Sequence, residues 1–310
     1  MLTFQEFCEK ADHLKRILIN PSYRFESLGT RGFFNNLSDE EYLKRMFKAR
    51  MGYELDLSNP QTFNEKIQWL KLHDHNPLYT TMVDKYAVKQ YAASIIGEQY
   101  IIPTLGVWER FEDINFDSLP SQFVLKCTHD SGGIVIVKDK NHLNLKVARK
   151  KINRSLKYNY FYFGREWPYK NVKARILAEE FLEDHATSEL RDYKFFCFNG
   201  KAKVLFIASD RQNPTTDTKF DFFDMEFHHL DFTNGHPNSE HQILKPSTFD
   251  EMKQLAEALS KDIPHVRVDF YDVDGKVYFG ELTFSHWSGF VPFEPPEWDK
   301  KFGDWIILPK

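Results

Sequence analysis

Residues 266–283 read VRVDFYDVDGKVYFGELT. Apolar and polar residues alternate through both halves of this stretch, at 266–270 and at 277–283, which is typical of β-strands with one buried face. Between the halves lies Asp274-Gly275, a dipeptide that favours a tight reversal of the chain. The stretch is therefore predicted to form an antiparallel hairpin.

The length of the turn decides whether Asp269 and Glu281 meet. A two-residue turn would pair Val268 with Glu281 and separate Asp269 from it. A three-residue loop over 273–275, with Gly275 in the left-handed conformation, would make the two carboxylates diagonal neighbours on one face. We expect the three-residue loop, unless a bulge adds a residue to one strand.

Asp269 and Glu281 would then form a carboxylate pair, with Arg267 beside it and Thr283 on the same face. Two carboxylates at such a distance repel each other unless a proton or a cation lies between them. Hard oxygen donors next to a phosphate suit Mg²⁺, so the pair predicts either a magnesium site or a surface charge cluster. Because removing one charge would relieve the repulsion, we expect substitution of either residue to cost little stability.

Other strands and helices precede this hairpin in the chain. Asn199-Gly200 lies between two apolar runs and predicts a second hairpin, and shorter apolar runs begin at about residue 100. Before that point the signals are helical, with capping boxes at Ser38 and Thr62 and a further helix expected over 84–97. Together these patterns predict an α+β fold with a helical N-terminal segment.

The composition is that of an ordinary globular protein. Of 310 residues, 42% are hydrophobic and 28% are charged, which excludes a disordered chain, a collagen-like fibre and a disulfide scaffold. The 41 Lys and Arg against 45 Asp and Glu give a net charge of −4, which argues against a dedicated nucleic-acid binder.

Three widely spaced cysteines, Cys8, Cys127 and Cys197, have no metal-ligand spacing and suggest a reducing compartment. The N-terminus mixes charges through its apolar residues and does not fit a signal peptide. No run approaches the ~18 apolar residues of a transmembrane helix. We therefore expect a cytoplasmic protein.

Lys126 ends an apolar run and is followed by CTHDSGG, residues 127–133. A loop with two glycines between strands can bring backbone N–H groups close to a phosphate, and a Lys at the strand end adds positive charge. A plain hairpin loop with a solvated Lys is the alternative. Lys85 and Lys89 share one face of the helix predicted over 84–97, where they form either a solvated basic face or part of an anion site.

The triplet Asp272-Val273-Asp274 permits a different function. Many metal-dependent glycosyltransferases hold a nucleotide-sugar diphosphate with an Asp-x-Asp triplet. Here the triplet overlaps a predicted turn, where Asp is common because its side chain bonds to the nearby backbone. We favour the turn and keep a glycosyltransferase as the alternative function.

From Asp84 to about Gly289, the order of these features resembles the ATP-grasp superfamily. The entry helix of that superfamily carries a Lys that reaches the nucleotide phosphates, here Lys85, and its central strand carries a second one, here Lys126. The loop 128–133 takes the place of the glycine-rich flap. The nucleotide ligands implied in this loop are Ser131, Gly132 and Gly133.

Residues 176–182, ILAEEFL, look like the superfamily's segment between the lobes, which holds adenine. The resemblance implies that Glu179 and the backbone at Glu180 and Leu182 contact the base. It also implies that Asp192 binds the ribose.

The hairpin at 266–283 looks like the closing motif of the superfamily. The resemblance implies that Asp269, Glu281 and Thr283 are magnesium ligands. It implies that Arg267, together with Lys126, is a catalytic group on the transferred phosphate. The position of Thr283 is usually Asn, so the geometry of a second metal could differ here, and an inactive scaffold protein is a further alternative.

Longer matches resemble the TupA-like ATP-grasp family of polysaccharide biosynthesis. They are PQTFNEKIQWLK (60–71), DKYAV (84–88), FVLKCTHDSG (123–132) and DYKFFCFNG (192–200). That family is associated with bacterial capsule, O-antigen and teichuronopeptide loci. Its proposed role is amide ligation of amino acids to uronic-acid polymers.

The resemblance implies an ATP-grasp fold, in which two α+β lobes with antiparallel sheets clamp ATP. We expect a helical extension over 1–80 and an ATP-grasp region over 81–310, with lobes at about 121–182 and 183–310. The expected function is an ATP- and Mg²⁺-dependent carboxylate–amine ligase that joins an amino acid or amine to a uronic acid through an acyl phosphate. No nucleic-acid partner is expected, and a peripheral association with a membrane polysaccharide assembly is compatible with this function.

Overall fold

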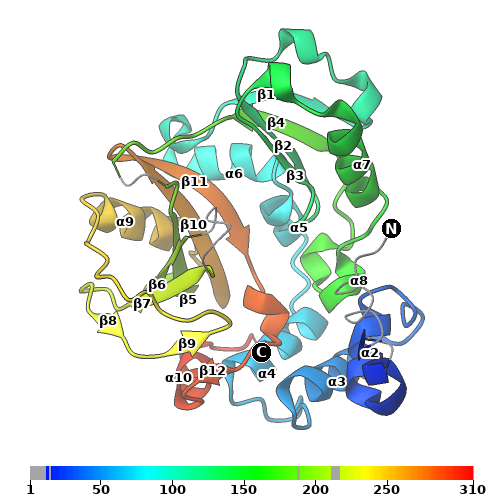
Figure 1. Ribbon diagram of the computed structural model, residues 1–310. Coiled ribbons are helices and arrows are strands. Elements are labelled where there is room, and N and C mark those ends of the chain that lie inside the picture. The colour runs from blue at the N-terminus through cyan, green and yellow to red at the C-terminus, as the bar shows by residue number, and fades with distance from the viewer. Residues whose placement is uncertain (1–11, 14, 187–188, 211–216, 310) are drawn as a thin grey trace.

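Two antiparallel sheets frame the computed structural model, which describes residues 12–13, 15–186, 189–210 and 217–309. The smaller sheet lies at the top of Figure 1 and the larger one at the lower left, with α6 (Ala87–Ile96) between them in this view. The predicted α+β class is confirmed. Cys8 lies outside the described residues.

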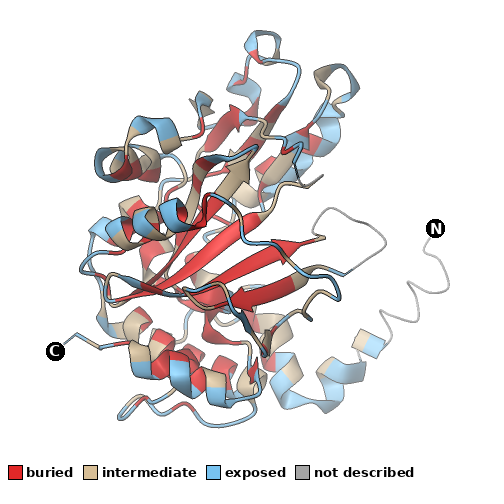
Figure 2. Ribbon diagram, turned by 90° about the vertical axis from the view of Figure 1, so that its left-hand side faces the viewer, coloured by how far each residue is buried: buried red, intermediate tan, exposed pale blue. Residues whose placement is uncertain are grey.

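The larger sheet has six strands. They are, in the order in which they lie side by side, β11 (Lys276–Thr283), β10 (His265–Val273), β5 (Asp192–Phe198), β6 (Lys201–Ser209), β7 (Lys219–Phe223) and β8 (His229–Leu230). Its central strands are buried on both faces because apolar side chains occupy both sets of alternating positions. On β5, Phe195 packs into the core on one face and Phe196 into the core on the other. Figure 2 shows these strands as the most buried part of the molecule.

Helices cover both faces of the larger sheet. The core on one face includes side chains of α5 (Leu78–Val83), α6 and α9 (Phe249–Leu259). The core on the other face includes side chains of α4 (Phe63–His73) and α10 (Glu297–Trp305). Because α4 shares a core with this sheet, the N-terminal helical region is packed directly against the second half of the chain.

The smaller sheet has the strand order β1 (Thr104–Trp108), β4 (Ile176–Glu180), β2 (Phe123–Cys127) and β3 (Ile134–Val137). One face packs against α7 (Leu145–Leu156), which buries Ala148 and Ile152 there. Lys126 therefore lies on an inner strand of this sheet, between the buried residues Leu125 and Cys127.

The N-terminal region is helical, as predicted. The capping box at Thr62 and Glu65 is present at the start of α4, and the Ser38 side chain accepts a hydrogen bond from the N–H of Glu41 at the start of α3. The remaining helices and strands are α2 (Pro21–Gly29), α3 (Asp39–Met51), α8 (Phe161–Gly164), β9 (Thr233–Asn234) and β12 (Phe293–Glu294). The 3₁₀ helices are η1 (Glu98–Tyr100), η2 (Phe111–Asp113), η3 (Phe116–Ser118), η4 (Lys140–His142), η5 (Trp167–Tyr169) and η6 (His286–Gly289).

The division into an extension and two lobes stays a prediction. Among the described helices, none combines the length and the apolar character needed to cross a membrane.

The turn of the β10–β11 hairpin differs from the prediction. Val273 pairs with Lys276, so the turn has two residues, and both Asp274 (φ 51°) and Gly275 (φ 83°) adopt the left-handed conformation. The expected three-residue loop is wrong. The register shifts later, between Asp269 and Phe270, because Gly280 is an extra residue on β11.

This bulge returns Asp269 and Glu281 to the same face of the hairpin, whereas the two-residue turn alone would have placed them on opposite faces. Beyond it, Asp269 pairs directly with Glu281, and Arg267 pairs with Thr283. The expected diagonal arrangement of the carboxylates is therefore replaced by a direct pair across the two strands.

Candidate active site

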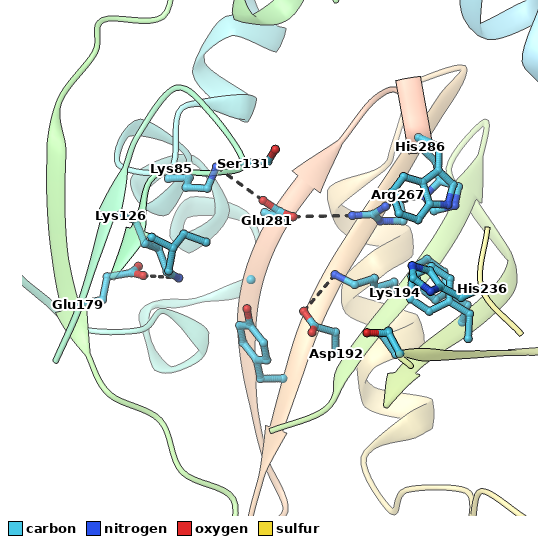
Figure 3. Close-up of a pocket in the computed structure, with 18 residues that line it drawn as sticks. Lys85, Lys126, Ser131, Glu179, Asp192, Lys194, His236, Arg267, Glu281 and His286 are labelled. Atoms are coloured by element: carbon cyan, nitrogen blue, oxygen red, sulfur yellow. Dashed lines mark hydrogen bonds and ion pairs between the residues drawn. The ribbon is translucent and has the colours of Figure 1, made fainter. Parts of the chain in front are cut away.

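A cavity of about 440 Å³ lies between the two sheets, and cationic side chains from both reach it (Figure 3). The loop before α6 supplies Lys85, β2 supplies Lys126, β5 supplies Lys194 and β10 supplies Arg267. Glu281 lies between these groups, with its carboxylate 3.8 Å from Lys85 Nζ and 3.7 Å from Arg267 Nη2. Such a convergence of positive charge suits a polyanionic ligand.

Glu179 organises the lysines of the smaller sheet. Its carboxylate lies 2.6 Å from Lys126 Nζ and 2.5 Å from Lys89 Nζ. Burial alone would raise the pKa of Glu179, but the two ammonium charges outweigh burial and hold this pKa below its ordinary value. For Lys89, burial dominates and lowers the pKa. Glu179 thus acts here as the anchor for two lysines.

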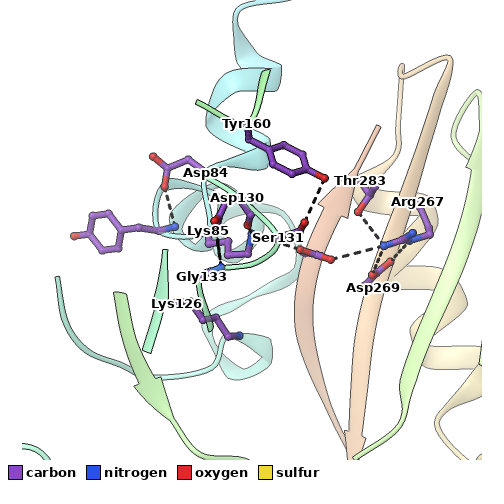
Figure 4. A network of polar contacts seen from close by, with 12 residues as sticks. Asp84, Lys85, Lys126, Asp130, Ser131, Gly133, Tyr160, Arg267, Asp269 and Thr283 are labelled. Carbon is purple, nitrogen blue, oxygen red and sulfur yellow. Dashed lines mark hydrogen bonds and ion pairs between the residues drawn. The ribbon is translucent and has the colours of Figure 1, made fainter. Parts of the chain in front are cut away.

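The loop after Lys126 is held by Lys85 and by its own residue Asp130 (Figure 4). Lys85 Nζ donates to the carbonyl of Asp130, and the Asp130 carboxylate accepts the Gly133 N–H at 3.1 Å. A Cβ at Gly133 would lie 2.6 Å from Cys127 Sγ, so glycine is required there by close packing. Among the loop residues, Ser131 lines the cavity.

Asp269 is buried behind the cationic wall of the cavity. Its side chain is 2% exposed, and it accepts hydrogen bonds from Arg267 Nε at 2.7 Å and Arg267 Nη2 at 2.8 Å. Lys194 Nζ also donates to this carboxylate and lies 3.0 Å from Asp192 Oδ1. Burial would raise the pKa of Asp269, but the two positive charges lower it. Burial lowers the pKa of Lys194.

The oxygen atoms predicted for magnesium share one face of the β10–β11 hairpin. The carboxylates of Asp269 and Glu281 and the hydroxyl of Thr283 are hard donors that fit Mg²⁺. A carboxylate oxygen has lone pairs for a second partner besides a cationic side chain. Within the described residues, no group of three or more His, Cys, Asp or Glu forms a metal site. A cation here would therefore take its other ligands from phosphate or water.

The hydrogen bonds of His286 fix its tautomer. Asn234 donates its amide N–H groups to the carbonyls of Val291 and Pro292, so its Oδ1 must accept from His286 Nε2 at 2.9 Å. His286 Nδ1 is then free to accept from Arg267 Nη1 at 2.7 Å. Burial, assisted by the charge of Arg267, lowers the pKa of His286 well below its ordinary value. His286 is thus a neutral acceptor that orients Arg267.

A second, more apolar cavity adjoins the first, and Lys126, Glu179 and Asp192 line both. Its volume is about 240 Å³. The segment after β4, residues 181–184, is neither helix nor strand, and Phe181 and Leu182 line this cavity. The residues that line this second cavity alone are Ile102, Val124, Ile136, Glu180, Phe181, Leu182 and Leu190.

The sequence profile of the family described as TupA-like ATPgrasp matches residues 65–307. The chain belongs to the TupA-like ATP-grasp family. Its fold is accordingly an ATP-grasp fold. No match was found among proteins with curated functions.

Several ATP-grasp ligases of known structure are similar to this chain at low identity. D-alanine–D-alanine ligase from Helicobacter pylori is 14% identical over 81% of this chain and 68% of its own, with a TM-score of 0.44. The Bacillus anthracis ligase of the same name, complexed with ATP, is 16% identical over 66% of this chain and 55% of its own, with a TM-score of 0.41. The ATP-grasp ligase PsnB, complexed with a minimal precursor, Mg and ADP, is 9% identical over 72% and 57%, with a TM-score of 0.39. This chain thus spans little more than half the length of the last two.

Most of the predicted residues of this TupA-like chain come together. Lys85, Lys126, Ser131, Glu179, Asp192, Arg267 and Glu281 line the first cavity, and Glu180 and Leu182 line the second. Sequence reasoning missed Lys194, although Asp192-x-Lys194 on a strand places both side chains on one face. Their meeting with Asp269 required the knowledge that β5 lies beside β10.

The two aspartates of the Asp272-x-Asp274 triplet form hydrogen bonds within and around the β10–β11 turn. Asp272 accepts from the Gly275 N–H at 2.9 Å and from the Thr248 hydroxyl at 2.6 Å, and Asp274 accepts from the His185 N–H. Of the residues that the structure describes, those lining the two cavities include neither aspartate. The turn therefore accounts for the triplet.

Proposed function

We propose that this chain is an ATP-dependent carboxylate–amine ligase of bacterial surface polysaccharide biosynthesis. The observation that carries the proposal is the convergence of Lys85, Lys126, Lys194 and Arg267 on one cavity between two sheets. The substrates would be a uronic acid and an amine or amino acid, as the family resemblance implies. Since the reaction consumes ATP, we place it in the cytoplasm, at or near the assembly that builds the polysaccharide.

In this proposal, the base of the nucleotide occupies the second cavity and its phosphates occupy the first. Adenine would occupy the apolar cavity, against the backbone of Glu180 and Leu182, with Asp192 at the ribose. The Glu180 N–H already donates to the Pro103 carbonyl at 3.2 Å, so the base would meet the other polar backbone groups of this segment. The phosphates would lie among Lys85, Lys126 and Ser131, while Gly132, which lines neither of the two cavities, and Gly133 would contribute the shape of the loop.

The reaction would proceed in two steps. A carboxylate oxygen attacks the γ-phosphorus, ADP leaves, and an acyl phosphate forms. The amine nitrogen then attacks the acyl carbon, inorganic phosphate leaves, and the amide forms with loss of a proton from nitrogen. A protein nucleophile is not required, so the residues act by positioning and by stabilising charge.

The Arg267 guanidinium is oriented by its neighbours and keeps one N–H donor for the transferred phosphate. A guanidinium has five N–H donors. Four of them are directed by Asp269, Thr283 and His286. The fifth, on Nη1, has no partner among the described residues and would face the phosphoryl oxygens. Magnesium, held by Asp269, Glu281 and Thr283, would neutralise charge on the phosphates when bound.

Ligand-dependent thermal stability tests the nucleotide class. A ligand that binds the folded state raises the melting temperature. We expect ATP with magnesium to raise it and UDP- or GDP-sugars to leave it unchanged. The reverse pattern would favour a glycosyltransferase. Release of ADP is then measured with a panel of uronic acids and amines, and the active pair identifies the substrates.

A further inference from the structure

Three aromatic rings wall the end of the first cavity that lies away from Glu179. They belong to Phe220 on β7, His236 in the loop after β9, and Trp287 in η6. The Phe220 and His236 ring centroids are 4.5 Å apart, and Phe220 is nearly parallel to Trp287 at 6.0 Å. Figure 3 shows His236 on the opposite side of the cavity from Glu179.

The indole of Trp287 is held in place but remains accessible. Trp287 is 40% exposed as a whole residue, and one side of its indole lies against Gly235, where a Cβ would come within 3.0 Å of Trp287 Nε1. Gly235 also has a φ of 82°, so two independent features require glycine at this position. The wall therefore presents a supported aromatic ring to whatever enters the cavity.

The backbone that carries Trp287 is strained. Trp287 (φ 50°) and Ser288 (φ 56°) both adopt the left-handed conformation, which costs about 1 kcal/mol or more for each non-glycine residue. Helix α4 restrains this segment, because Gln68 Nε2 donates to the carbonyls of Ser288 and Gly289, and Lys71 Nζ donates to the Ser288 carbonyl at 2.7 Å. Strain of this kind persists where the surroundings enforce a conformation, often at ligand sites.

We propose that Trp287, with Phe220 and His236, forms the acceptor subsite and binds the pyranose ring of a uronic acid. The proposal rests on the ligase function and assigns one of its two substrates to a place. A pyranose has a face of C–H groups that packs on an aromatic ring and a rim of hydroxyl groups that need polar partners. The cavity supplies both kinds of group, since Thr218 lines it together with the rings.

The charges of the cavity orient the sugar. Arg267 and Lys194 line the same cavity as the aromatic wall, so a carboxylate on the pyranose ring can reach the cations while the ring lies on Trp287. This orientation points the carboxylate toward the place proposed for the γ-phosphate. An apolar amino-acid side chain would pack on the rings but leave the polar groups that line the cavity without partners, which favours the sugar.

Calorimetric binding of glucuronate and of short glucuronate oligosaccharides tests the assignment. The titrations are made with magnesium and a non-hydrolysable ATP analogue, with succinate as a carboxylate that lacks a ring. We expect Trp287→Ala to weaken uronate binding by about tenfold or more, and Trp287→Phe by less, because a smaller ring retains part of the stacking. Binding of the ATP analogue should be unchanged in both variants. Phe33→Ala removes an exposed aromatic ring from the N-terminal region and is the matched control.

The outcomes separate this inference from the function on which it rests. Uronate binding that is absent in the wild type, or unaffected by Trp287→Ala, overturns the subsite. Leucine, an apolar amino acid, is titrated in the same way. If Trp287→Ala weakens its binding and leaves uronate binding unchanged, the wall belongs to the amine and the subsite is also overturned. If uronate binds through Trp287 but no amine and uronate pair stimulates ADP release, the subsite stands and the ligase function fails.

Discussion

Asp269 faces Glu281 across the β10–β11 ladder because Gly280 is an extra residue between Phe279 and Glu281. The two-residue turn at the end of the hairpin would otherwise have placed the two carboxylates on opposite faces. A Cβ at Gly280 would come within 3.0 Å of the Asp269 carbonyl oxygen, so the bulge and the glycine depend on each other. The carboxylate pair is thus built by a local irregularity of one strand.

Gly280→Ala should disturb this pair. We expect a loss of about 1–3 kcal/mol in the free energy of unfolding, because the methyl group crowds the Asp269 backbone. Magnesium-dependent ATP turnover should fall as well. Gly275→Ala is the control, since its φ of 83° also disfavours alanine but nothing lies within 4 Å of the added Cβ. If both variants retain full turnover, the bulge does not position the carboxylates.

Asp269→Asn and Glu281→Gln should differ in stability, contrary to the sequence-based expectation that both cost little. Asp269 is buried between Arg267 and Lys194, so removing its charge takes the bidentate partner from Arg267 and leaves Lys194 with Asp192 alone, at a cost of about 3 kcal/mol or more. Glu281 is 37% exposed and more distant from its cations, so Glu281→Gln should change stability by about 0.5 kcal/mol or less. Urea unfolding measures both values. Equal stability losses would contradict this account, whereas both variants should lose magnesium-dependent turnover.

Lys126→Met should weaken ATP binding while leaving the fold intact. Glu179 keeps its second partner, Lys89, so the buried carboxylate stays compensated. The loss of a positive charge at the phosphates should raise the Kd for ATP by about tenfold or more. Lys146→Met, at an exposed position on α7, is the control and should bind ATP normally. Normal affinity in Lys126→Met would remove this residue from the proposed site.

The buried amine of Lys71 should make the free energy of unfolding increase with pH. Burial lowers its pKa to about 7, below the ordinary value of 10.5. Between these two values the unfolded chain binds more protons than the folded chain, so the Lys71 contribution to stability increases as the pH rises through this window. Below about pH 7, the cost of burying the charged amine is present in full.

Unfolding free energies at about pH 7 and about pH 9 measure this effect. The increase should be larger in the wild type than in Lys71→Met, which has no titrating amine at this position. Equal increases in the two proteins would show that Lys71 does not titrate in this range. Only the difference between the two pH values is compared, because the substitution also removes the hydrogen bonds to Ser288.

Several parts of the fold could be predicted from local sequence. The capping box at Thr62 and Glu65, and the turns at Asn199-Gly200 and Asp274-Gly275, depend on residues within a few positions of each other. The alternation of apolar residues then indicated strands, because side chains on a strand alternate between its faces. Lys126 could be placed at a strand end for the same reason, although its role depends on what faces it.

The contacts that make the site could not be predicted in this way. The bulge at Gly280 has no turn signature and follows from the fit of the backbone to Asp269. The position of the Trp287 ring depends on Gly235, which lies against the indole, and on Gln68, which bonds to the next residue and is more than 200 positions away in the chain.

By itself, the sequence determined the class of the elements, the hairpin turns and the family, because each follows from local patterns of side chains. Only the tertiary structure decided that Lys194 reaches Asp269 and that α4 restrains the segment carrying Trp287. Those pairings arise from the order of strands in the sheet and from helix packing. Both are set by the burial of apolar surface between distant parts of the chain, which no local pattern specifies.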